Sequence, residues 1–218
     1  MRLISSSRKA TTKDLPSIVS LHVSVFRGFF LTLLGRRFLS ELYRGFIAEQ
    51  DGICRVIEAE LQPGQAAVVG FVAGTVRPEI FFRRLLFRRG MFFACAAVPG
   101  LLKHPMLVFP RLVNAIRYRG ERPPSIEHAA LLSSIGVDPK VARLGFGRML
   151  VDIFCEDAVA LGARAVYLTT AQQGNDSVNT FYDRAGFRLL AAKRSKNGRV
   201  MNTYWRPIER LGRGENDF

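Results

Sequence analysis

The stretch Val-Asp-Pro-Lys-Val-Ala-Arg-Leu-Gly-Phe-Gly, residues 137–147, stands between a predicted strand and a predicted helix. Gly145 and Gly147 let the backbone turn tightly and leave several N–H groups unbonded at the start of the helix. Converging N–H donors and the positive end of the helix dipole suit a diphosphate. A plain tight turn would use the same residues, and the three-glycine dinucleotide fingerprint is absent because position 150 is Leu. The stretch therefore predicts an anion-binding turn only together with other signals.

A second segment, residues 175–187, reads Asn-Asp-Ser-Val-Asn-Thr-Phe-Tyr-Asp-Arg-Ala-Gly-Phe. Tyr182 follows Asn175 by seven residues, which is two turns along one helix face. The Asn175 side chain can cap the helix or reach a ligand, and both interpretations stay open. Tyr182 can be a tyrosine that packs in the core or a site residue that faces a ligand.

Helical and strand patterns alternate around these two segments. Before position 77 they predict helices over residues 15–26 and 30–48, and a hairpin of strands over 54–61 and 66–76. From position 125 on they predict strands over 130–137, 165–170, 187–193 and 200–205, with helices over 145–161 and 175–185. Gly162 ends the first of these helices, Asn197-Gly198 marks a turn, and residues 208–218 form a loose polar tail.

Together, the two segments resemble the GNAT superfamily of acetyl-CoA-dependent N-acetyltransferases. That family has a strand ending in Val-x-Pro, then Arg/Gln-x-x-Gly-x-Gly/Ala on a helix, and later an Asn, a Tyr seven residues on and a Gly-Phe pair. The matching positions are Val137, Pro139, Gly145, Gly147, Asn175, Tyr182, Gly186 and Phe187. One position departs, because Ala142 stands where the family has Arg or Gln, and Arg143 or Lys140 could supply that contact.

The resemblance implies an α/β (α+β) fold in a single domain over residues 1–218. Its central sheet is expected to be mixed, mostly antiparallel and of about seven strands flanked by helices, with a helical insertion at 77–124 between the third and fourth strands.

The same resemblance implies an activity, the transfer of an acetyl group from acetyl-CoA to an amine acceptor by direct attack in a ternary complex. The strand before the turn is expected to separate from its neighbour so that the pantetheine arm lies beside it. An N–H nearby would stabilise charge on the thioester oxygen, and Tyr182, whose ordinary pKa is about 10, would protonate the departing thiolate. The expected cofactor-binding residues are Ile135, Gly136, Val137, Ala142, Arg143, Leu144, Gly145, Phe146, Gly147, Arg148, Asn175 and Tyr182.

A general base is harder to assign, because an acceptor amine is mostly protonated in water and must lose a proton before it attacks. Glu127 and His128 precede the strand at 130–137 and could act directly or through water. The open alternatives are a solvated strand-edge charge for Glu127 and a packed or surface imidazole for His128. His22 and Cys155 lie among helix residues and are interpreted as structural.

Residues 77–124 differ chemically from the rest of the chain. Their prolines predict two or three short helices, and between positions 77 and 122 ten basic side chains face two acidic ones. Phenylalanines alternate with arginines over residues 81–93, a composition suited to an anionic membrane surface. The alternatives are a helical lid on the core, a wall of the acceptor pocket and a homodimer contact. The absence of a helix-turn-helix or RNA-binding motif argues against nucleic acid as the partner.

The whole chain is basic, with 32 Lys and Arg against 18 Asp and Glu and a net charge of +14, which favours a polyanionic partner such as a phosphorylated cofactor. The three cysteines are scattered, so neither a disulfide framework nor a zinc site is predicted, and no metal is expected. The start of the chain lacks an apolar stretch and prolines interrupt the apolar window at 91–110, so neither a secretory signal nor a spanning helix is predicted. The expected location is the cytoplasm, with the membrane periphery as an open alternative.

Two other functions compete with catalysis. One is a non-catalytic acyl-CoA-binding or regulatory domain, and the other is a basic protein associated with a membrane surface or nucleic acid. The acceptor stays open between amino sugars, small amines, protein N-termini and lysines, and a hydroxyl acceptor is also compatible with the sequence.

Overall fold

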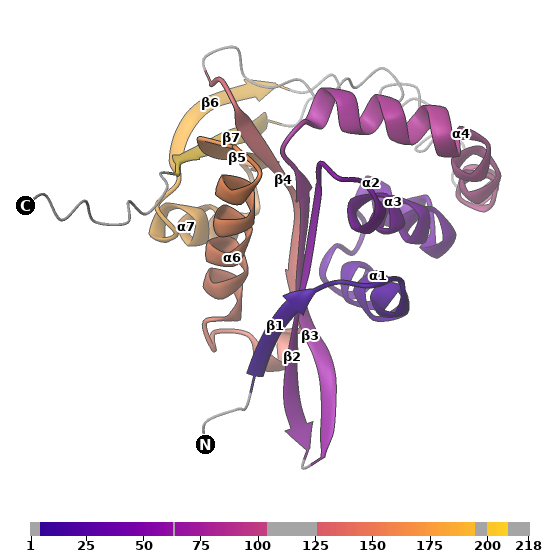
Figure 1. The fold of residues 1–218 in the computed structure, drawn as a ribbon, viewed down its shortest axis with the longest axis horizontal. Coiled ribbons are helices and arrows are strands. Elements are labelled where there is room, and N and C mark those ends of the chain that lie inside the picture. The colour runs from indigo at the N-terminus through magenta and orange to yellow at the C-terminus, as the bar shows by residue number, and fades with distance from the viewer. Residues whose placement is uncertain (1–4, 63, 104–125, 195–199, 209–218) are drawn as a thin grey trace, which may run out of the picture.

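The computed structural model describes residues 5–62, 64–103, 126–194 and 200–208. Seven strands form one sheet in the order β1-β2-β3-β4-β5-β7-β6 (Figure 1). They are β1 (Ser5–Lys9), β2 (Gly52–Gln62), β3 (Gln65–Thr75), β4 (Ala129–Val137), β5 (Ala165–Ala171), β6 (Arg188–Arg194) and β7 (Val200–Pro207). All neighbouring strands are antiparallel except β4 and β5. The prediction of a single α/β domain with a mixed, mostly antiparallel sheet is confirmed.

Helices cover both faces of the sheet. They are α1 (Leu15–Val25), α2 (Phe30–Leu33), α3 (Arg36–Ala48), α4 (Pro78–Lys103), α6 (Phe146–Ala160) and α7 (Asp176–Arg184). α6 and α7 lie on one face, and α1 to α4 lie on the other (Figure 1). Each face of the sheet has its own hydrophobic core. Leu150 and Phe154 of α6 belong to the core on one face, and Tyr43 and Phe46 of α3 belong to the core on the other. Because the middle strands are buried on both faces, they are nearly continuous apolar runs.

Residues 30–48 form two helices where the sequence pattern predicted one. Gly35 has a φ of 94°, which a helix interior does not allow, and α3 starts directly after it. Its N–H donates to the carbonyl of Thr32, which closes α2. The apolar spacing continues through the break, so the pattern alone did not reveal it.

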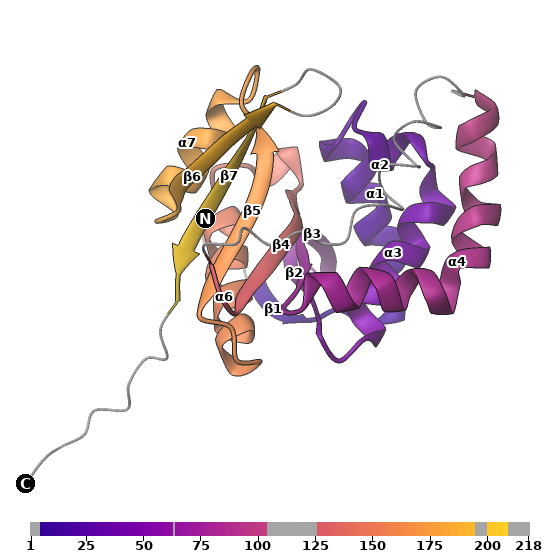
Figure 2. The same ribbon diagram turned by 90° about the horizontal axis from the view of Figure 1, so that it is seen from above.

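The prediction of two or three short helices in residues 77–124 is wrong for the described part, because α4 is one continuous helix of 26 residues with Pro99 inside it. Residues 104–124 lie outside the described residues. α4 is bent in both views (Figures 1 and 2), and bending is the usual response of a helix to residues such as Gly90 and Pro99. Proline removes one backbone hydrogen bond, and the packing of the helix offsets that loss.

α4 packs onto α3 through aromatic side chains. Phe81 stacks on Phe46 with ring centroids 4.7 Å apart, and Phe93 meets Phe38 edge-on at 4.8 Å. These contacts pack the described part of residues 77–124 onto the core. Long helix α4 therefore joins β3 to the segment that leads into β4.

Of the described helices, none is long and apolar enough to cross a bilayer. Residues 209–218 of the predicted tail and the predicted turn at Asn197-Gly198 lie outside the described residues.

Candidate active site

The sheet opens between β4 and β5. These parallel strands pair only from Ala129 to Leu131, opposite Ala165 to Tyr167, although both continue beyond that point. A register shift against β3 leaves Ser133 as an extra residue in β4 just after the last pair. Such bulges bend a strand and are common beside active sites. The edge of β4 that faces β5 therefore offers backbone groups to a ligand between the strands.

A cavity of about 680 Å³ occupies this opening, and we name it the central cavity. Its walls come from β4, β5, α7 and the turn before α6, and from α1 and α2 on the other side. Eight of the twelve predicted cofactor-binding residues line it: Ile135, Gly136, Val137, Ala142, Arg143, Gly147, Asn175 and Tyr182. The other four, Leu144, Gly145, Phe146 and Arg148, do not. Phe146 is buried in the core, and the Arg148 guanidinium donates to Asp152 and to the carbonyl of Arg184.

The turn before α6 has the backbone shape of an anion site. Arg143 has a φ of 69° and Gly145 a φ of 86°, so the residues on both sides of Leu144 are left-handed. Left-handed residues within such a turn direct neighbouring N–H groups toward one side, which makes a concave nest for anions. A non-glycine residue in this conformation is uncommon and carries roughly 1–3 kcal/mol of backbone strain. Gly147 has a packing role, because a Cβ there would lie 3.2 Å from the ring of Phe181.

Asn175 joins α7 to the end of β5. It stands at the N-cap position of α7, but its side chain makes no capping hydrogen bond, so the capping interpretation does not hold. Its Nδ2 donates to Oγ1 of Thr170 at 2.7 Å and to the carbonyl of Ala171 at 3.3 Å. The side chain therefore holds the two walls of the central cavity together.

Tyr182 lies in the wall of the central cavity with its ring buried. The ring contacts those of Phe181, Phe187 and Tyr204, at centroid distances of 5.2, 5.6 and 6.0 Å. Burial raises the pKa of the phenol well above its ordinary value. The hydroxyl therefore stays protonated at neutral pH and has a proton to donate.

His22, interpreted as structural from the sequence, also lies in the wall of the central cavity. Its Nδ1 is 2.6 Å from the hydroxyl of Tyr43, which also hydrogen-bonds to Ser134 of β4. Burial lowers the pKa of His22 to about 4, so the ring is neutral at pH 7. Its Nε2 has no hydrogen-bond partner in the described part of the chain. The sequence signal for this series of hydrogen bonds was the pair Ser133-Ser134, which places two hydroxyls in an otherwise apolar strand.

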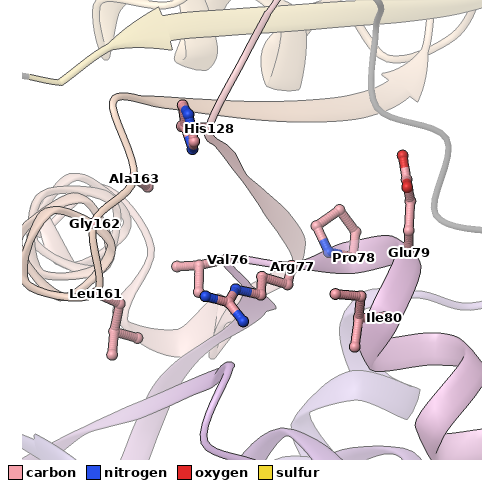
Figure 3. A pocket seen from close by; sticks show the side chains of 9 residues that line it. All are labelled: Val76, Arg77, Pro78, Glu79, Ile80, His128, Leu161, Gly162 and Ala163. Atoms are coloured by element: carbon pink, nitrogen blue, oxygen red, sulfur yellow. The ribbon is translucent and has the colours of Figure 1, made fainter.

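Glu127 and His128 are not brought together with Tyr182. Both are exposed and lie just before β4, at the end of the strand opposite the anion-binding turn. His128 lines a different pocket, of about 420 Å³, whose other walls include Arg77 and Leu161 (Figure 3). The prediction of a general base at Glu127 or His128 therefore has no support in this geometry.

The described residues contain no group of three or more His, Cys, Asp or Glu side chains placed to hold a metal ion. Cys155 is buried in the core, and burial raises the pKa of its thiol to about 11. A thiol with so high a pKa is not an activated nucleophile.

A mixed sheet that opens between two parallel strands, with a left-handed turn at the end of the opening, agrees with the fold that the resemblance implied. The acetyltransferase (GNAT) family model matches residues 110–187. Over these residues the chain resembles the GNAT acetyltransferases.

Similar solved structures include the ribosomal-protein-S18-alanine N-acetyltransferase of Escherichia coli, with 14% identity, a TM-score of 0.56 and 99% of each chain covered. Ard1 of Thermoplasma volcanium has 16% identity and a TM-score of 0.58, with 94% of this chain and 98% of the other covered. A point mutant of the spermidine N-acetyltransferase SpeG of Vibrio cholerae has 15% identity and a TM-score of 0.58, with 94% of each chain covered. No curated protein sequence matches the chain. At these identities the structures establish the fold, and the acceptor is not identified.

Proposed function

We propose that this protein transfers the acetyl group of acetyl-CoA to an amine acceptor by direct attack while both are bound. The observation that supports the proposal is the central cavity, which joins the anion-binding turn, the open edge of β4 and Tyr182 in one space. A binding site for a diphosphate, a slot for a long arm and a proton donor are the three features that an acyl-CoA donor requires.

The chain offers residues for the diphosphate and for the arm of the coenzyme. The N–H groups of residues 143–148 would hold the diphosphate, because the first amides of α6 have no partner within the helix. Arg143, which lines the cavity, would supply the positive charge missing at Ala142. Ile135, Gly136 and Val137 would bind the arm along the open edge of β4.

Two groups would assist acyl transfer. A backbone N–H of β4 beside the bulge would stabilise the negative charge that develops on the thioester oxygen, a contribution worth about 3 kcal/mol. Tyr182 would donate its proton to the sulfur as the carbon–sulfur bond breaks. Its raised pKa keeps it in the acid form over the whole working range.

The acceptor has to arrive as the free amine. Of the described residues that line the central cavity, only His22, Arg143 and Tyr182 are titratable. Burial raises the pKa of Tyr182, so it stays protonated, and a pKa of about 4 makes His22 a weak base. We therefore expect the rate to rise with pH up to the pKa of the acceptor amine, without a falling limb below pH 10.

Binding and turnover are tested separately. Acetyl-CoA at a hundredfold excess over its Kd should stabilise the fold by about 2.7 kcal/mol, measured as a raised melting temperature. A panel containing a polyamine, an amino sugar, a lysine peptide and a peptide with a free N-terminus, read by release of the CoA thiol, would identify the acceptor.

Tyr182→Phe should lower turnover about a hundredfold or more and leave the affinity for acetyl-CoA nearly intact. The matched control is Tyr204→Phe, which removes a hydroxyl from the same ring cluster. In the wild-type protein that hydroxyl donates a hydrogen bond to Oδ1 of Asn179. Unchanged turnover in Tyr182→Phe would remove it as the acid. Binding without turnover on any acceptor would favour the non-catalytic acyl-CoA-binding alternative.

A second candidate function is contact with a membrane surface through α4. Phe87, Met91 and Leu102 are 91%, 78% and 77% exposed, and Phe87 and Met91, four residues apart, lie on one side of the helix. Exposed apolar side chains in a row are a feature of helices that lie in the membrane interface. The arginines contribute less than the sequence suggested, because Arg84 and Arg88 lie 3.3 Å from Asp51 and 3.1 Å from Glu49.

The protein should therefore float with liposomes, and it should do so better with anionic than with neutral ones. Phe87→Ser with Met91→Ser should abolish flotation, whereas Leu189→Ser, an exposed apolar residue of β6, should not. Loss of flotation in the control as well would contradict the assignment to α4. A dimer that forms without lipid and dissociates in the double variant would assign this surface to self-association.

A further inference from the structure

A second cavity, of about 380 Å³, lies under α4, and we name it the α4 cavity. α4 supplies six of its thirteen lining residues, and the others come from α2, α3, β4 and β5. Only Ser133 and Thr169 among these lining residues carry polar side chains, and none of the thirteen is acidic, basic or an imidazole. The volume lies in the range of ligand pockets, about 300–1,000 Å³.

The α4 cavity meets the central cavity where β4 and β5 have separated. Four residues line both: Leu31, Leu132, Ser133 and Thr169. Ser133 is the bulge residue of β4, and Thr169 belongs to the unpaired part of β5. The two polar residues of the α4 cavity therefore stand at its junction with the central cavity, and the remainder is apolar.

The thioester of a bound donor would lie at this junction. The anion-binding turn fixes the diphosphate end beyond Val137, and the arm runs back along β4 toward Ser133. The strand advances about 13 Å between these two residues. Whatever is attached to the sulfur then faces the opening of the α4 cavity.

The chemistry of the α4 cavity selects an alkyl chain as its occupant. A chain that continues from the thioester carbonyl needs only apolar contact, which α4 and α3 supply. An amine acceptor placed there would have its N–H groups away from water without partners, which is unfavourable. We propose that the α4 cavity binds the acyl chain of the donor, so that the enzyme accepts medium-chain acyl-CoA thioesters. This inference rests on the proposed function, because the chain enters from a donor held in the central cavity.

The test measures donor affinity without any acceptor. Calorimetric titration compares CoA, acetyl-CoA, butanoyl-CoA, octanoyl-CoA and dodecanoyl-CoA, each below its micelle concentration. Each methylene that enters the cavity should tighten binding about fourfold. Octanoyl-CoA is thus expected to bind at least a hundredfold more tightly than acetyl-CoA.

Gly90 offers a variant that fills the cavity. It lines the α4 cavity from within α4, and a Cβ added there would meet no atom within 4 Å. Gly90→Leu therefore places a side chain in open space and also improves the helix propensity, so the fold is expected to persist. The matched control is Gly90→Ala, which gains a similar propensity and fills little space.

In Gly90→Leu, the affinity for octanoyl-CoA should fall at least tenfold while that for acetyl-CoA, whose two carbons do not reach α4, stays the same. In Gly90→Ala, the affinity should still increase with acyl chain length almost as much as in the wild-type protein. CoA affinity that is independent of chain length would overturn the inference and leave the proposed function standing. A chain-length gain that survives in Gly90→Leu would place the chain elsewhere and also overturn it. Absence of any CoA binding would overturn the proposed function and the inference together.

Discussion

His22→Asn tests whether the central cavity depends on a neutral imidazole. In the folded protein the pKa of His22 is about 4, below its ordinary value of 6.5, because the ring is buried between Tyr43 and Phe26. On acidification the unfolded chain takes up a proton at this residue before the folded chain does. Stability from a neutral His22 is therefore fully present above pH 6.5 and lost as the pH falls toward 4. Linkage between pH 7 and pH 4.5 gives a loss of about 2 kcal/mol in the free energy of unfolding.

The assay is urea denaturation of the wild-type protein and His22→Asn at pH 7, 6, 5 and 4.5. Asn keeps a polar atom close to the position of Nδ1, so its bond to Tyr43 can persist, but it does not titrate. The wild-type protein should lose about 2 kcal/mol more than the variant over this range. Asp14, whose pKa the hydrogen bond from Arg8 lowers to about 2, loses its contribution only below pH 4. The control is His128→Asn, which replaces an exposed imidazole at a φ of 49° that Asn tolerates. Equal pH slopes in the wild-type protein and His22→Asn would refute the reasoning.

Three further substitutions test how the walls of the site are held. Gly145→Ala forces a Cβ onto a residue with a φ of 86°, so it should lower stability by about 1 kcal/mol and weaken acetyl-CoA binding, measured by denaturation and calorimetry. Asp157→Asn breaks the two-point pair in which Nε and Nη2 of Arg55 each lie 2.6 Å from a carboxylate oxygen. It should cost about 2 kcal/mol, and no loss would show that α6 is held to β2 by packing alone. Gly74→Ala would place a Cβ 2.1 Å from the carbonyl oxygen of Leu131, so about 3 kcal/mol or loss of folding is expected, and near wild-type stability would refute this contact.

Local patterns predicted the elements around the site and missed those whose signals are tertiary. The helix that became α6 has its start at Gly145 and its end near Gly162, and both were readable from the sequence. β1 was not assigned from its residues, since Ser5–Lys9 is a polar edge strand without an apolar alternation. Its place comes from pairing with β2 and from Arg8, which bonds to Asp14 and Glu58.

The far wall of the central cavity lay beyond sequence reasoning for a different reason. His22 is separated from Tyr182 by 160 positions, and its apolar neighbours in α1 resemble any buried helix face. Nothing in local spacing indicates that α1 lies opposite α7 across an opening in the sheet. The same holds for Glu127 and His128, because proximity to a central strand in sequence does not specify which end of that strand lines the central cavity.

The single extra residue in β4 explains why one strand serves both cavities. In a regular strand, Leu132 and Ile135 would point to opposite faces because they stand three positions apart. Both instead pack in the core on the α6 side, while Ser134 between them reaches Tyr43 on the α3 side. The bulge at Ser133 permits this by shifting the alternation of the strand by one residue. Ser133 then lines both cavities and Ser134 lines the central cavity, close to where the pairing with β5 ends. The bulge residue therefore stands both beside the opening between β4 and β5 and at the junction of the two cavities.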